Sequence, residues 1–134
     1  MKGKIAVIIV IAAIAVLAWK VFSPAPVEAG YPMISDIPNQ KIPINSSTPV
    51  IQFTIYDDIT TPDNLKLTYR SENPDLVPES DDNITLGGSG KNRTVQITPS
   101  PGKWGMAPII IIVTDTDGDT NRDAFEVDVV RPPQ

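Results

Sequence analysis

The fold of this 134-residue chain is decided by Val50-Ile51-Gln52-Phe53-Thr54-Ile55-Tyr56. Apolar side chains at Ile51, Phe53 and Ile55 alternate with polar ones at Gln52 and Thr54. Successive side chains of a strand point to opposite faces, so a period of two separates the apolar set from the polar set. The stretch is therefore predicted to be a half-buried strand.

Six further segments read as strands. The same alternation recurs in residues 65–69, 94–98 and 124–129. Residues 109–113 are an unbroken β-branched run, which predicts a central strand buried on both faces. Residues 33–37 and 41–44 are interrupted by Pro38 and Pro43, and proline confines a strand to the edge of a sheet.

Seven short strands separated by turns predict an all-β fold, an antiparallel β-sandwich over residues 31–134. The glycine-rich residues 87–92 are expected to form one of the turns. About 100 residues suffice for one domain with its own core and not comfortably for two. No amphipathic helix of useful length is expected after residue 22.

The first 22 residues predict a single transmembrane signal-anchor helix. Lys2 and Lys4 precede an uncharged apolar run over residues 5–19, and Lys20 is followed by Val21 and Phe22. With Lys20 snorkelling, residues 5–22 make a helix of about 27 Å, close to the roughly 30 Å of hydrocarbon in a bilayer. The positive-inside bias keeps the N-terminus in the cytoplasm, so lipid surrounds residues 5–22 and the domain lies outside.

A cleaved signal peptide is the competing interpretation of this segment. Val27-Glu28-Ala29 before Gly30 has the small residues that a signal peptidase accepts. If the anchor is kept, the proline-bearing residues 23–30 form a semi-extended stalk that holds the domain off the bilayer.

Composition narrows the class of function. The chain has no Cys and no His, so it lacks a disulfide framework, the commonest general base and a favoured zinc ligand. Of the 16 acidic residues only Glu28 precedes residue 30, whereas three of the 11 basic residues do, which leaves a domain charge of about −7. This charge argues against nucleic acid as a partner. No nucleophile has a suitable base, so catalysis and cofactors are not expected.

The domain resembles a known family along most of its length. The resemblance is carried by residues 34–42, 53–57, 65–68, 71–78, 84–95, 97–99 and 111–115, including Ser71-Glu72-Asn73-Pro74-Asp75-Leu76-Val77-Pro78. These segments resemble the bacterial immunoglobulin-like or cadherin-like repeats of large surface proteins. The resemblance implies a bacterial Ig-like sandwich. Together with the predicted anchor, this gives a bacterial cytoplasmic (inner) membrane location with the domain in the periplasm or extracellular space. Family members usually stand in tandem arrays, whereas this chain carries one copy.

The acidic residues 115–123 have two interpretations. Carboxylates at Asp115, Asp117, Asp119 and Asp123 follow the alternate spacing of calcium loops, and calcium prefers such oxygen ligands. Gly118 comes too early for an EF-hand, however, and Asp117-Gly118 is a strong hairpin signal. A hairpin is expected, and calcium is possible without being expected.

Two sets of residues are candidate partner contacts. In the predicted helix, Ala12, Ala13 and Ala15 would allow close packing against other helices, with Trp19 at the far interface, although alanine is also common in such helices. In the domain, Trp104 beside Met106 forms either an exposed contact patch or a cap on the open end of the core.

The sequence thus predicts a non-enzymatic, single-pass membrane protein. The first hypothesis is an accessory subunit that braces a larger photosynthetic, respiratory or transport complex and contacts other membrane-protein subunits. The second is a free surface module that binds protein, carbohydrate or calcium. A filament built on the hydrophobic helix is a weaker third option.

Overall fold

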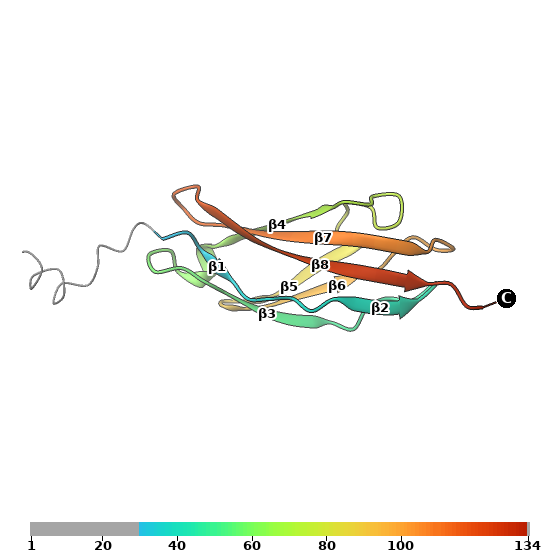
Figure 1. Ribbon diagram of the computed structural model, residues 1–134. Helices are drawn as coiled ribbons and strands as arrows, with labels where there is room; N and C mark the ends of the chain where they lie inside the picture. Colours follow the sequence, from blue (N-terminus) through green and yellow to red (C-terminus); the bar gives the residue numbers. More distant parts are fainter. Residues whose placement is uncertain (1–29, 134) are drawn as a thin grey trace, which may run out of the picture.

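The computed structural model describes residues 30–133, which form two β-sheets packed face to face (Figure 1). Residue 30 lies at one end of the sandwich and the C-terminus at the other (Figure 1). The predicted anchor, residues 1–22, and the predicted stalk up to residue 29 lie outside the described residues. Within residues 30–133, no helix has the length and hydrophobicity needed to cross a membrane.

The first sheet is antiparallel throughout. Its strands, in spatial order, are β1 (Met33–Ile34), β3 (Ile51–Tyr56), β6 (Asn92–Ile97) and β5 (Ile84–Ser89). In β3, Ile51, Phe53 and Ile55 are buried and their neighbours in the strand are exposed. The alternation quoted from the sequence therefore predicts this strand and its buried face correctly.

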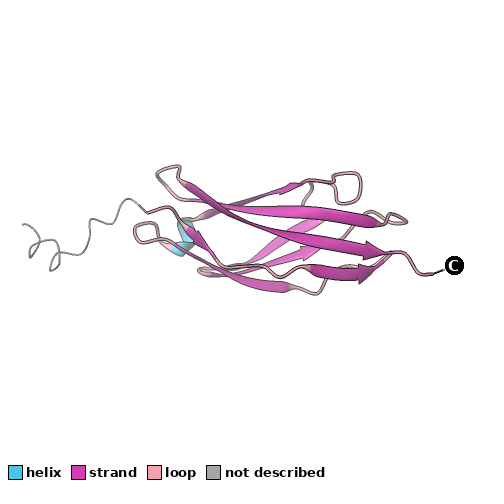
Figure 2. Ribbon diagram, in the orientation of Figure 1, coloured by secondary structure: helices cyan, strands magenta, loops and turns pink. Residues whose placement is uncertain are grey.

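The second sheet contains the two longest strands. Its strands, in spatial order, are β2 (Gln40–Pro43), β8 (Thr120–Val130), β7 (Gly105–Thr114) and β4 (Lys66–Ser71). β7 and β8 form a long antiparallel hairpin, and β4 pairs antiparallel with β7. A short 3-10 turn, η1 (Pro62–Asn64), precedes β4 (Figure 2).

The chain changes sheet between β1 and β2. Pro38 has no backbone N–H and so interrupts the strand. On either side of it the chain is held to β8, because Asp123 Oδ2 accepts the N–H of Ile37 at 2.8 Å and Asn39 Oδ1 accepts that of Glu126 at 2.9 Å. In the strand letters of immunoglobulin domains, β1, β3, β6 and β5 are strands A, B, E and D, and β4, β7 and β8 are strands C, F and G. The parallel strand β2 is added at the edge of the second sheet, and the whole is an immunoglobulin arrangement.

The structure differs from the predicted topology in two ways. Eight strands are described in place of seven, because Gly87, Gly88 and Ser89 belong to β5 and the turn comes after them. Gly88 has φ 85°, and a Cβ there would lie 2.4 Å from the carbonyl oxygen of Asn92, so glycine is required within the strand. The sheets are also not wholly antiparallel, since β2 runs parallel to β8.

The core consists of the inward side chains of both sheets and the loops that close them. Its buried apolar members are Ile37, Ile42, Ile51, Phe53, Ile55, Leu65, Leu76, Val77, Ile84, Val95, Ile97, Ala107, Ile109, Ile111, Val113, Phe125, Val127 and Val129. Each large aliphatic side chain buried in this way contributes about 1.5–3 kcal/mol. The domain thus has a continuous core without any disulfide.

One strand is less buried than predicted. In β7, Ile109, Ile111 and Val113 have no exposed surface, but Ile110 and Ile112 are only half-buried on the outer side of the sheet. The prediction that residues 109–113 are buried on both faces is therefore wrong. Nothing among the described residues covers the outer face of this sheet.

Candidate functional site

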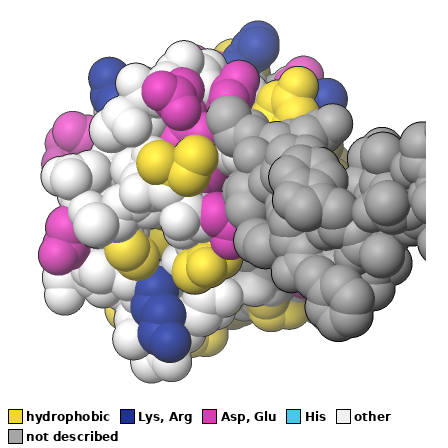
Figure 3. Space-filling view, turned by 90° about the vertical axis from the view of Figure 1, so that its left-hand side faces the viewer, with side chains coloured by type: hydrophobic (Ala, Val, Ile, Leu, Met, Phe, Trp, Pro, Cys, Tyr) yellow, Lys and Arg dark blue, Asp and Glu magenta, His cyan; other side chains and the backbone are white. Residues whose placement is uncertain are grey.

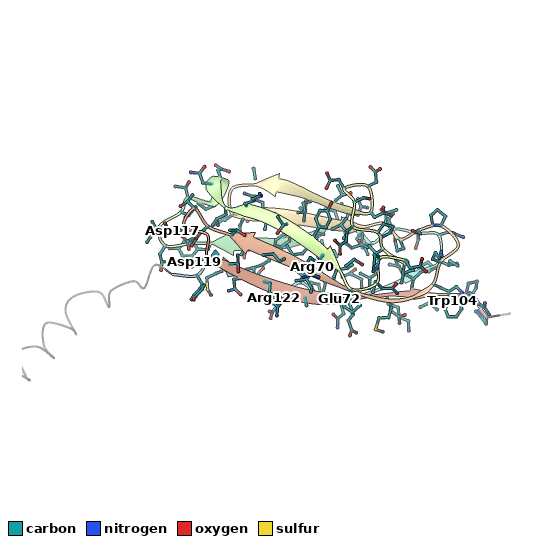
Figure 4. The ribbon with its side chains drawn as sticks, turned by 90° about the horizontal axis from the view of Figure 1, so that it is seen from above. Arg70, Glu72, Trp104, Asp117, Asp119 and Arg122 are labelled. Atoms are coloured by element: carbon teal, nitrogen blue, oxygen red, sulfur yellow. The ribbon has the colours of Figure 1, made fainter. Side chains whose placement is uncertain are left out.

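Trp104 and Met106 lie on the surface, and Trp104 lies at the end of the domain opposite residue 30 (Figure 4). Trp104 is 55% exposed and Met106 48% exposed. The guanidinium carbon of Arg131 lies 5.0 Å from the centre of the Trp104 ring, within range of a cation–π contact. Trp104 therefore does not cap the core, and the exposed alternative describes its position.

The two residues begin an apolar row along the outer side of β7. Met106, Pro108, Ile110 and Ile112 alternate with buried residues of the same strand, so all of them point outward. Trp104 precedes the strand at the Met106 end of the row, and Gly105, with φ 128°, interrupts the alternation between these two residues. We call these five residues, Trp104, Met106, Pro108, Ile110 and Ile112, the β7 row.

A shallow groove lies along β2 and the C-terminal end of β8. Val130 lies directly across from Pro43 in the register of β8 and β2, and Val130 is 37% exposed. The groove has a volume of about 470 Å³ and is lined by Lys41, Ile42, Pro43, Ile44, Val130 and Pro132. Its walls offer aliphatic contact and one ammonium group. They hold no acid–base pair.

Sequence reasoning identified only the first two residues of the β7 row. It placed Ile110 and Ile112 in the core because the run from 109 to 113 contains no polar residue. The residues paired with Ile110 and Ile112 on the neighbouring strands indicate their outward position. Arg70 and Ala124 flank Ile110, and Arg122 flanks Ile112. Exposed arginines beside an isoleucine indicate an outward position.

Charged side chains surround the middle of the row. Arg70, Glu72 and Arg122 lie partway along the sandwich, between Trp104 at one end and Asp117 and Asp119 at the other (Figure 4). Arg70, Glu72 and Arg122 are all exposed.

Residues 115–119 form the turn of the β7–β8 hairpin, as expected, and residues 120–123 begin β8. Asp115 is 7% exposed, and its Oδ1 accepts the backbone N–H groups of Asp117 and Asp119, each at 2.9 Å. Gly118 has φ 91°, a conformation that favours glycine. The buried carboxylate thus holds the turn together from inside.

The neighbouring loop uses its carboxylates in the same way. Asp57 Oδ2 accepts the N–H groups of Ile59 and Thr60, at 3.1 and 2.7 Å, and Asp63 Oδ1 accepts that of Gly90 at 2.8 Å. Acidic and apolar side chains are interspersed over this end of the molecule (Figure 3). Among residues 30–133, no three potential metal ligands gather in one place.

Two tyrosines are held in their neutral form by carboxylates. Tyr69 donates its hydroxyl to Asp81 Oδ1 at 2.5 Å, and this hydrogen bond raises the pKa of Tyr69 to about 12. Asp58 raises the pKa of Tyr56 through a hydrogen bond as well. Tyr69 lies on β4, paired with Ile111 of β7 and packed against the core, and Tyr56 lies on the first sheet.

The remaining predicted contact residues, Ala12, Ala13, Ala15 and Trp19, lie outside the described residues. The structure therefore does not relate them to Trp104 and Met106, which it places together at one end of the β7 row.

Comparison with known proteins finds no family model that matches the chain. No curated protein matches its sequence either. The similarity is to solved structures, and it lies in the fold.

A titin M4 domain superimposes with a TM-score of 0.55 at 14% identity, over 76% of this chain and 98% of that one. A chain of the titin M10–obscurin-like 1 Ig complex gives 0.55 at 11% identity, over 78% of this chain and 98% of that one. The N-terminal Ig1-2 module of the Drosophila receptor protein tyrosine phosphatase DLAR gives 0.57 at 14% identity, over 78% of this chain and 52% of that one. Residues 30–133 thus have an immunoglobulin-like fold.

Proposed function

We propose that this chain is a non-enzymatic, single-pass membrane protein whose extracytoplasmic Ig-like domain is an accessory subunit of a larger membrane complex, for example a photosynthetic, respiratory or transport assembly. Residues 5–22 lie in the lipid of a bacterial cytoplasmic membrane, with the N-terminus in the cytoplasm. The observation that carries the proposal is the β7 row, an apolar surface that ends in a tryptophan 55% exposed to solvent.

An exposed apolar row of this kind favours contact with another protein. Soluble domains rarely expose contiguous apolar surface, and tryptophan is among the residues that contribute most to protein interfaces. One of the solved structures similar in fold is a complex of titin M10 with an Ig domain of obscurin-like 1. Contact through one side of the sandwich is therefore within the means of the fold.

The polar side chains give no support to catalysis. The buried carboxylates of Asp57 and Asp115 accept backbone N–H groups of their own loops. Such bonds organise turns. The role we assign to these residues is structural.

Extraction in mild detergent followed by native mass spectrometry tests the proposal. The full chain is expected to leave the membrane with other subunits in fixed stoichiometry. Trp104→Ser together with Met106→Ser should release it from them, because the change removes the exposed apolar end of the row.

Met33→Ser with Tyr56→Ser is the matched control. Met33 and Tyr56 are paired on the outer side of the first sheet and are 58% and 53% exposed, much like Trp104 and Met106. This control should stay associated. A chain extracted without companions would overturn the subunit role and favour a free surface module.

A further inference from the structure

The charges beside the β7 row differ between its two halves. Beside Ile110 and Ile112 lie two arginines, Arg70 on β4 and Arg122 on β8. Beside Pro108 and Met106 lie three acids, and the exposed Lys41 of β2 lies next to Asp128. Glu126 and Asp128 face Pro108 and Met106 from β8, and Glu72 donates its backbone N–H to the carbonyl oxygen of Pro108.

All of these charged residues point to the same side of the sheet. Arg70 and Glu72 flank the buried Ser71, and Asp128 lies between the buried Val127 and Val129. Side chains alternate along a strand, so the neighbours of a buried residue face outward with the row. The face is therefore basic in one half, mainly acidic in the other, where Lys41 lies beside Asp128, and apolar along its middle.

We propose that the partner covering this face is a second copy of the chain, packed face to face and antiparallel, with a two-fold axis that crosses the strands near Ile109. Such an axis brings Ile112 and its neighbours on β4 and β8 opposite Met106 and its neighbours in the other copy. Arg122 of one copy then meets Asp128 of the other, and Arg70 meets Glu72. An isologous interface repeats each contact, so both ion pairs form twice.

The parallel arrangement is disfavoured by the same charges. If both copies ran in the same direction, the basic half of one would face the basic half of the other, and likewise the acidic halves. Like charges brought together across an interface suppress the wrong pairing. The charge pattern selects one orientation of the two copies.

The two ends beyond the face also carry opposite charges, with acids next to the basic half and an arginine next to the acidic half. Asp117 and Asp119 lie in the hairpin turn beyond Ile112, and Arg131, which stacks on Trp104, lies at the opposite end. In the antiparallel pair these groups come together. Each turn would then contribute acidic groups close to the partner's exposed tryptophan and its guanidinium.

The size of the face indicates a weak, reversible pair. From Trp104 to Ile112 the row spans about 27 Å, and three strands with their side chains cover about 15–20 Å across. The resulting area, on the order of 500 Å² per copy, is below the roughly 800 Å² of a standard interface. Association is expected at high local concentration, such as that of proteins held in one assembly.

The inference rests on the proposed function, because it names the partner of the same surface. It can fail alone. If the chain is bound to other subunits through Trp104 and Met106 while copies of it never associate, the subunit role stands and the second copy is excluded.

Complementary charge variants of the full chain test the pair. Arg122→Glu should weaken self-association about tenfold or more, because the new carboxylate would meet the partner's aspartate twice. Asp128→Arg should do the same, because the new guanidinium would meet the partner's arginine twice. A one-to-one mixture of the two variants should recover association, since each contact is then between opposite charges. Sedimentation velocity in mild detergent measures the fraction of dimer in each single variant and in their mixture.

The double variant Arg122→Glu with Asp128→Arg in one chain is the rescue control, and it should associate like the unchanged protein. Positions 122 and 128 are about 20 Å apart along β8, well beyond the roughly 8–10 Å over which salt screens charges, so rescue cannot come from within one chain. An unchanged chain that stays monomeric at every concentration would overturn the inference. So would dimers that neither charge variant weakens, which would point to association through residues 1–22.

Discussion

The outer sides of the two sheets carry different chemistry. At the centre of the first sheet the outward residues are polar and uncharged: Gln52, Thr54, Thr85, Gly87, Asn92, Thr94 and Gln96. At the centre of the second sheet they are isoleucines between arginines and carboxylates. Met33 and Tyr56 are exposed at the edge of the first sheet, but its centre has no large apolar side chain and gains little by being covered. Isoleucine in contact with water gains about 25 cal/mol for each Å² removed from it. The comparison indicates that the domain has one side for contact and one side for solvent.

The largest expected effect separates the two sides of β7. Ile111→Ala should lower the free energy of unfolding by about 3 kcal/mol, because it leaves a cavity in the core. Ile110→Ala, one residue away and half-buried, should cost about 1 kcal/mol or less. Urea denaturation followed by circular dichroism measures both. Equal losses would mean that Ile110 belongs to the core and that the outer side is not an open surface.

A smaller effect compares the two outer sides directly. Ile112→Gln replaces part of the β7 row with a side chain that the first sheet already presents at Gln52 and Gln96. Self-association should weaken about tenfold, since half-buried isoleucine is lost from both copies. Thr54→Gln, the matched change on the first sheet, should leave association unaltered. Sedimentation velocity measures self-association of both variants. If Thr54→Gln weakened it as much as Ile112→Gln, the two outer sides would not differ in their contribution to association.

The smallest effect concerns the tyrosine of the second sheet. The pKa of Tyr69 is raised to about 12 from the ordinary 10.0, so its neutral form is favoured in the folded state. The stability it contributes is fully present below about pH 10 and is lost as the pH rises through about 12. Tyr69→Phe should remove this part of the alkaline loss and cost below about 1 kcal/mol at pH 7, because the hydrogen bond is exposed. Denaturation midpoints between these pH values measure it. An unchanged alkaline loss in the variant would assign it to other groups.

Local pattern predicted much of the fold. The period-two alternation in β3, β6 and β8 identified these strands and the side they bury, because a half-buried strand must alternate. It failed in β5, where Gly87 and Gly88 resemble a turn but pair with Thr94 and Arg93. The candidate site was predicted only at Trp104 and Met106, which the surrounding glycines and prolines place in a loop or at a strand end.

The sequence alone determined an all-strand, disulfide-free domain with an Asp-Gly hairpin, because these features follow from the order of neighbouring residues. Only the tertiary structure decided which side of β7 meets solvent, the parallel pairing of β2 with β8, and the gathering of Arg70, Arg122 and Glu72 around the isoleucines. These outcomes depend on which strands become neighbours, and pairing between segments roughly 40–90 residues apart leaves no mark in the spacing of either one.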